Sequence, residues 1–208
     1  MSDLQNIEPK KVFHWFYELN QIPRCSGDEK RVSDFLVNFA KERNLEVYQD
    51  EAYNVIIKKE GTKGYENSDP VIIQGHMDMV CIKGKGSKHD FSRDPIEMIV
   101  EGDVLRANNT TLGGDNGIAI AYALAILDSD DLKHPPLEVL ITTSEETGMD
   151  GARALTNEHL SGKILLNIDT EEEGVFIVSC AGGSNKITTF PLQKENVSGK
   201  GLEIKISG

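Results

Sequence analysis

Apolar residues recur at helical spacing in two segments near the start of the chain. The first spans residues 12–19, and Ile22-Pro23 follows it, which is typical of a helix end. The second opens near residues 26–29 and is expected to stop at Asn44. Its apolar stripe consists of Val32, Phe35, Leu36, Phe39 and Ala40. The pattern therefore predicts two amphipathic helices, each with one face toward a core.

The apolar runs that follow have the length of strands. Two short runs lie at residues 45–48 and 54–58. Runs at residues 71–74, 137–143 and 164–168 are apolar at most positions, which is typical of interior strands in a sheet covered by helices. Each of these three leads directly into histidine or acidic residues. Because ligands bind beyond the carboxyl ends of such strands, this edge of the sheet is the expected site.

A further apolar segment, residues 118–127, is apolar on almost all sides and predicts a buried helix with Asp115 at its start. We therefore expect an α/β fold with a central twisted mixed sheet and helices on both faces. Four separate segments then deliver polar residues to one end of that sheet.

The pattern of apolar and polar residues changes after about residue 183. Residues 186–190 and 202–206 alternate between apolar and polar side chains, which predicts strands with one solvent-exposed face. We therefore expect a first domain at residues 1–182 and, at residues 183–208, the opening strands of a second, α+β domain that is cut short.

Charge and composition narrow the possible partners. The net charge of the 208-residue chain is -12, and its 34 acidic residues are spread along the sequence, so nucleic acid and anionic membranes are unlikely partners. The start of the chain carries no basic and apolar leader, and no window reaches the roughly 18 apolar residues of a membrane helix. We expect a cytoplasmic protein. Carboxylates could also serve divalent cations.

The cysteines indicate neither a disulfide framework nor a zinc finger. Cys25, Cys81 and Cys180 are odd in number, far apart and free of metal-binding spacing. We expect buried free thiols in a reducing compartment.

His76 and Asp78 would lie on the same side of a strand end, since the side-chain period of a strand is two. They could bind a metal or form a structural hydrogen-bonded pair. Asp115 stands among glycines that permit close backbone approach, and it could be a ligand or the N-cap of the following helix.

Glu145 and Glu146 are adjacent after a buried strand, so one could bind a metal while the other faces substrate or water. The alternative is a solvated acidic turn. Asp169 also comes directly after a predicted strand and is therefore a further candidate ligand. The acidic residues at 171–173 are expected to be exposed to solvent. Nucleophilic chemistry is less favoured, because Ser144 lies in no Gly-x-Ser-x-Gly elbow and the cysteines have no activating setting.

Several segments resemble known motifs. Gly-His-Met-Asp-Met-Val at 75–80, Thr-Leu-Gly-Gly-Asp-Asn-Gly at 111–117 and Thr-Ser-Glu-Glu-Thr-Gly at 143–148 resemble the three motifs of the di-zinc exopeptidase clan, which contains the aminoacyl-histidine dipeptidases. Further segments that resemble this dipeptidase group in particular are residues 22–24, 48–52, 134–139 and 167–169. The sequence departs from the motifs of this group at two positions, where Gly114 replaces an expected Ala and Ser144 an expected Asp. Neither position is an expected metal ligand.

The resemblance implies specific roles. Asp115 would bridge two zinc ions, which cobalt or manganese could replace, and the metal ligands would be completed by His76, Glu146 and Asp169. Asp78 would accept a hydrogen bond from His76 and fix its tautomer. Glu145 would be the general base. The implied reaction is hydrolysis of dipeptides, of the Xaa-His type and with broad specificity.

Other implications concern backbone and assembly. We expect a cis peptide between Asp115 and Asn116, and a homodimer formed through the lid domain that begins at residues 183–208.

Members of the group carry a further histidine ligand after the inserted lid. His14, His89, His134 and His159 match no such motif, so we expect the chain to be a fragment with weak or no activity of its own. The alternatives are another amide hydrolase of the same clan and a non-catalytic metal-binding module.

Overall fold

The computed structural model describes residues 4, 7–170, 172, 174–179, 187–191, 193 and 198–205. The chain divides into two units, Met1–Gly174 and Val175–Gly208. The first unit contains a five-stranded sheet in the order β1-β2-β6-β3-β7. Its strands are β1 (Glu46–Gln49), β2 (Val55–Lys59), β3 (Val71–His76), β6 (Leu137–Thr142) and β7 (Ile164–Asn167).

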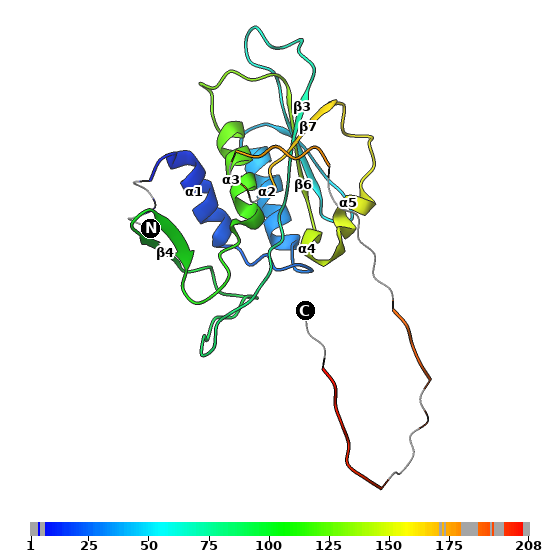
Figure 1. Cartoon of the computed structure of the whole chain (residues 1–208). Helices are drawn as coiled ribbons and strands as arrows, with labels where there is room; N and C mark the ends of the chain where they lie inside the picture. Colours follow the sequence, from blue (N-terminus) through cyan, green and yellow to red (C-terminus); the bar gives the residue numbers. More distant parts are fainter. Residues whose placement is uncertain are drawn as a thin grey trace. The chain divides into compact units, whose positions relative to one another are not determined.

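The sheet is mixed, as expected. β3 runs parallel to β6 and β7, whereas β2 is antiparallel to β1 and β6. His76 lies opposite Thr142, and Gln74 lies opposite Asn167. The carboxyl ends of β3, β6 and β7 therefore share one edge of the sheet (Figure 1). This confirms the predicted convergence of strand ends.

Three helices lie on one side of this sheet. They are α1 (Lys10–Asn20), α2 (Lys30–Glu42) and α3 (Gly114–Leu127). α3 packs between α1 and β3, and α2 packs on β1 and β2 (Figure 1). Their apolar stripes bury Phe16, Leu36 and Leu124 against the inward side chains of the strands, including Ile57 and Ile141. The predicted helices and their α/β packing are thus confirmed.

The other face of the sheet carries a smaller apolar cluster of Ile56, Ile72 and Leu140. Among the described residues, Leu155 and Leu160 pack against it, from the segment that follows the short helices α4 (Glu145–Gly148) and α5 (Asp150–Ala154). Within the described part of the chain, the three long helices therefore lie on one side of the sheet, and the segment after α5 packs on the other.

β7 differs from its prediction. Its apolar run suggested an interior strand, but in the described sheet β7 is an edge strand, and Leu165 and Leu166 are 51% and 50% exposed. An apolar run indicates that its side chains favour burial. Burial on both sides also requires a neighbouring strand, which the run itself cannot indicate.

A hairpin of β4 (Met98–Glu101) and β5 (Val104–Ala107) forms a separate two-stranded sheet that the sequence pattern did not indicate. Its turn contains Gly102, whose φ of 64° suits a glycine. The strands are only four residues each, too short for a clear alternation.

In the second unit, the described residues at 187–190 and 202–205 form no strand, so the strands predicted at 186–190 and 202–206 are not found there. Lys186 and Ile206 lie outside the described residues. A strand requires a ladder of hydrogen bonds with a partner, and alternation alone cannot provide one. The expected division at residues 182 and 183 remains a prediction.

The free-thiol expectation is wrong for two cysteines. Cys25 and Cys81 form a disulfide, with their Cα atoms 5.7 Å apart. The chain brings them together because Cys25 pairs with Met79 in a parallel bridge, a contact across 56 residues of sequence that spacing could not reveal. Cys180 lies outside the described residues. No helix within the described part of the chain is long and apolar enough to cross a membrane.

Candidate metal centre

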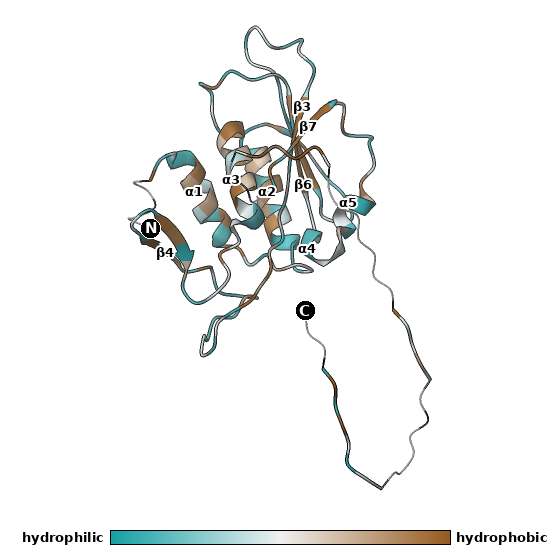
Figure 2. Ribbon diagram, viewed as in Figure 1, coloured by the Kyte–Doolittle hydropathy of each residue, from teal (hydrophilic) through white to brown (hydrophobic). Residues whose placement is uncertain are grey.

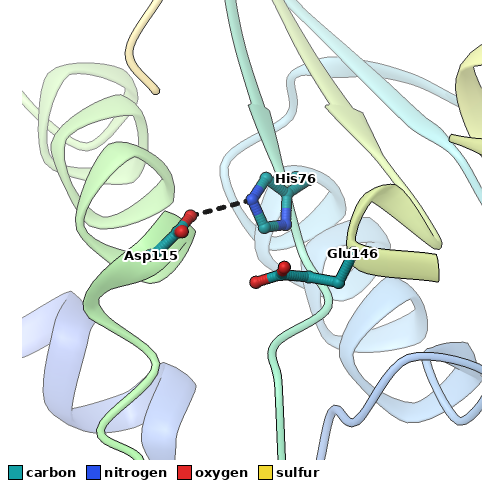
Figure 3. Close-up of side chains that lie close together, drawn as sticks. All are labelled: His76, Asp115 and Glu146. Carbon is teal, nitrogen blue, oxygen red and sulfur yellow. Dashed lines mark hydrogen bonds and ion pairs between the residues drawn. The ribbon is translucent and has the colours of Figure 1, made fainter. Parts of the chain in front are cut away.

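Side chains from three elements meet at the shared edge of the sheet. His76 ends β3, Asp115 lies in the first turn of α3, and Glu146 belongs to α4. One potential ligand atom from each lies within 4.8 Å of the other two. Figure 3 shows the three side chains pointing into the same space, and Figure 2 shows α4 as a hydrophilic element. The elements therefore present one imidazole and two carboxylates to a common point.

His76 is 1% exposed, and both of its ring nitrogens have partners. Nδ1 lies 3.1 Å from the carbonyl oxygen of Asp78 and 3.2 Å from its Oδ1. Nε2 lies 3.0 Å from Oδ1 of Asp115. The ring is thus oriented from the Nδ1 side and turns Nε2 toward the carboxylates, which is the arrangement of an oriented imidazole ligand.

Asp78 is fully buried and holds both the histidine and α4. Its carboxylate accepts hydrogen bonds from the Ser26 hydroxyl at 2.8 Å and from the backbone amides of Glu145 and Glu146 at 3.1 and 3.2 Å. Burial raises the pKa of Asp78, but the hydrogen bonds outweigh it and lower the pKa below its usual value. The Asp78 carboxylate is therefore charged near neutral pH.

The strand-to-helix junction that carries the two glutamates is also fixed from outside. Ser144 has a φ of 52°, and Oε1 of Glu29 accepts hydrogen bonds from its amide at 3.1 Å and its hydroxyl at 3.0 Å. Oε2 of Glu145 lies 3.9 Å from Nε2 of His76. Burial, followed by the charge of Asp115, raises the pKa of Glu146. The solvated acidic turn is therefore a poor description of this segment.

Asp169 lies beside the three-residue cluster. Its Oδ1 is 3.8 Å from Nε2 of His76 and accepts a hydrogen bond of 3.0 Å from Nδ2 of Asn116. Asn116 also accepts a hydrogen bond from the His76 amide at 3.1 Å, so it ties β3 to the segment after β7. The peptide between Asp115 and Asn116 is cis, as expected.

The carboxylates around His76 all raise its pKa. Burial alone lowers the pKa of His76, but hydrogen bonds and charges from Asp78, Asp169 and Asp115 outweigh it and raise the pKa to about 9. Burial raises the pKa of Asp169; the charge of His76 opposes this increase, and the charges of Asp115 and Glu145 add to it. So many carboxylates around one imidazole favour a cation at their centre.

The donor set fits a divalent metal. An imidazole nitrogen with carboxylate oxygens suits zinc, and manganese and cobalt accept the same donors. The predicted residues His76, Asp78, Asp115, Glu145, Glu146 and Asp169 all lie in this region. The sequence reasoning missed the supporting residues Ser26, Glu29 and Asn116, since each acts through a contact that only the fold creates.

Comparison with known proteins agrees with this geometry. The model of a family described as Peptidase family M20/M25/M40 matches residues 72–196, which include the histidine and both glutamates. The chain therefore belongs to this family of peptidases, and the resemblance seen in the sequence is confirmed.

Individual relatives narrow the comparison. The chain is 42% identical over 197 residues to the cytosol non-specific dipeptidase of Escherichia coli (strain K12), which covers 95% of this chain and 41% of the relative. The crystal structure of aminoacylhistidine dipeptidase from Vibrio alginolyticus superposes with a TM-score of 0.81 at 42% identity, covering 84% of this chain and 36% of that one. A tripeptidase from Staphylococcus aureus, with a TM-score of 0.66 at 24% identity over 80% of this chain and 44% of that one, shows the shared fold alone. The chain spans less than half the length of these relatives.

Proposed function

We propose that this chain is part of a metal-dependent dipeptidase that hydrolyses dipeptides of the Xaa-His type with broad specificity. The observation that carries the proposal is the meeting of His76, Asp115 and Glu146 within 4.8 Å, next to the Glu145 carboxylate. Family membership and the 42% identity to a dipeptidase support the same reaction.

The proposed ligands would hold two zinc ions, for which cobalt or manganese could substitute. Asp115, His76, Asp169 and Glu146 would be the ligands that this chain supplies, with Asp115 shared between the two ions. When bound, such ions lower the pKa of a water molecule and polarise the scissile carbonyl. Asp78 acts as a positioning group, because its carboxylate fixes the imidazole and both glutamate amides.

Glu145 is the proposed general base. Its carboxylate lies at the rim of the cluster, with a side chain that is 34% exposed and 3.9 Å from the His76 ring. It can therefore take a proton from the attacking water and pass it to the nitrogen of the leaving amino acid. The water oxygen forms the new bond to the carbonyl carbon as the peptide C–N bond breaks.

The proposal extends to the location and partners of the protein. One relative is named as cytosolic, which agrees with a cytoplasmic location for this protein. The negative net charge argues against nucleic acid and anionic membranes as partners. We further propose a homodimer, formed through the lid domain that begins at residues 183–208.

Product analysis tests the substrate class. The longest product of the reading frame that includes these residues is incubated with zinc, mixed dipeptides, tripeptides and N-acyl amino acids. We expect free amino acids from dipeptides, with Xaa-His among the substrates cleaved. Preferential cleavage of tripeptides or N-acyl amino acids would instead assign another amide hydrolase of this family.

A further inference from the structure

Arg24 is a buried cation that connects two of the segments carrying the site. Its side chain is 1% exposed. Nη1 donates to the carbonyl oxygens of Met77 at 3.0 Å and Asp78 at 3.3 Å, while Nη2 donates to the carbonyl oxygen of Gly113 at 2.6 Å. The first two carbonyls follow His76 directly, and the third lies two residues before Asp115. One guanidinium therefore spans the histidine segment and the aspartate segment.

The start of α3 is shaped around this group. A Cβ atom at Gly113 would lie 2.3 Å from Nη2 of Arg24, and one at Gly117 would lie 2.6 Å from the same atom. Both glycines therefore leave the space that the guanidinium occupies. The backbone of Arg24 adds a further link, because its carbonyl oxygen accepts a hydrogen bond of 3.1 Å from the Met79 amide.

Helix stability does not explain a cation here. The N-terminal end of a helix carries a partial positive charge, so an arginine beside it is unfavourable. Within the described part of the chain, Arg24 forms no salt bridge with a carboxylate. Burial lowers the pKa of Arg24 to about 10, while the charges of Asp78 and Asp115 favour its charged form. It therefore remains a cation near neutral pH, close to the carboxylates of the site.

We propose that Arg24 is a positioning residue of the metal centre: its planar guanidinium sets the separation between the His76 segment and the Asp115 segment, and so preorganises the two ligands. The inference rests on the proposed function. A planar fork can donate in several fixed directions at once, whereas the ammonium of a lysine is a point charge on a flexible stem. Charge alone is therefore not sufficient for this task.

The test compares Arg24→Lys and Arg24→Met with matched changes at Arg43. Arg43 also uses several donors, to Oδ1 of Asp128 at 2.7 Å and to the carbonyl oxygen of Phe39 at 3.1 Å. Asp128 caps the far end of α3, about 20 Å along the helix from Asp115. Arg43→Lys and Arg43→Met thus lower stability without touching the metal centre.

Zinc affinity is measured on the longest product of the reading frame that includes these residues, by competition with a chromophoric chelator, and cobalt absorption spectra report ligand geometry. We expect both Arg24 variants to bind zinc at least about tenfold more weakly and to change the cobalt spectrum. Both Arg43 variants should match the unchanged chain in affinity and spectrum. Unchanged affinity and spectrum in a folded Arg24 variant would overturn the inference alone, whereas no zinc binding by the unchanged longest product would overturn the proposed function as well.

A measurement on the unchanged chain decides the case in which neither Arg24 variant folds. Nitrogen NMR of the guanidinium should show separate Nη resonances for Arg24 without metal, because its hydrogen bonds restrict rotation. Addition of zinc should shift these resonances. A single averaged resonance that zinc leaves unchanged would contradict a positioning role.

Discussion

The buried carboxylate of Asp78 accepts a hydrogen bond of 3.1 Å from the backbone amide of Glu145. The same carboxylate lies 3.2 Å from Nδ1 of His76. One side chain therefore couples the orientation of the histidine at the end of β3 to the position of the glutamates in α4. The proposed ligand and the proposed base are held by a common group, although they lie in β3 and α4, which are far apart in the sequence.

Replacement of Asp78 by asparagine tests this coupling. The asparagine side chain would have a similar volume but no negative charge. The charged carboxylate of Asp78 orients His76 and accepts hydrogen bonds from two backbone amides. We expect Asp78→Asn to weaken zinc binding about 10–100-fold, as measured by chelator competition. Asp128→Asn, which removes a carboxylate at the far end of α3, should leave zinc affinity unchanged. Equal affinity in both variants would show that Asp78 does not position the site.

The role of Glu145 predicts a different pattern. Glu145→Gln in the longest product of the reading frame should keep its zinc content and lose at least about 100-fold in kcat, the usual contribution of a general base. Zinc content is measured by atomic absorption, and kcat by histidine release from an Xaa-His dipeptide. Glu172→Gln changes an exposed acid outside the cluster and should keep full activity. Near-normal turnover in Glu145→Gln would rule out the assigned role.

Replacement of two glycines at the start of α3 by alanine should change stability to different extents. A Cβ at Gly117 would lie 2.6 Å from Arg24 and 3.2 Å from Cε2 of Phe16, so Gly117→Ala should lower the free energy of unfolding by about 1–3 kcal/mol. A Cβ at Gly114 would meet no atom within 4 Å, and Gly114→Ala should change it by less than about 0.5 kcal/mol. Urea denaturation of both variants checks the contrast. Equal effects would argue against a tightly enclosed Arg24.

Glu138 predicts a pH-dependent contribution to stability. Its carboxylate accepts hydrogen bonds from the Ser161 amide and hydroxyl and from the Gly162 amide. Burial raises the pKa of Glu138, but these bonds outweigh it and lower the pKa below its usual value. A lowered folded-state pKa means that the stabilisation is complete above the usual pKa of about 4.3 and is lost as the pH falls through the folded value.

Glu138→Gln should therefore lower the free energy of unfolding at pH 7 by about 1.5–3 kcal/mol, the contribution of hydrogen bonds to a charged group. The difference from the unchanged chain should shrink as the pH falls below about 4. Urea denaturation at several pH values measures it, with the exposed Glu51→Gln as control. A difference that stays constant down to about pH 3 would contradict this account.

The sequence predicted the parts of the fold that depend on local pattern. Helical spacing located α1 and α2, and the apolar runs at residues 71–74 and 137–143 located β3 and β6. The parallel pairing of these strands explains why residues far apart in the sequence could be assigned to one edge. Contacts that depend on the assembled fold were not predictable, such as the Cys25–Cys81 disulfide and the hydrogen bonds of Arg24.

The strands expected after residue 183 show the limit of such patterns. Ile187 and Leu202 are 91% and 87% exposed, and the described residues around them form no strand. Alternation states which face a strand would bury, but burial and pairing require a partner. The candidate site was more predictable, since its residues lie at or just after the ends of β3, β6 and β7 or open α3.

The central claim is that this cluster supports metal-dependent hydrolysis of dipeptides. Its most direct test is histidine release from an Xaa-His dipeptide by the longest product of the reading frame, before and after exhaustive chelation and after zinc is returned. The account predicts that release stops on chelation and recovers with zinc. Release that continues unchanged after complete metal removal would contradict it.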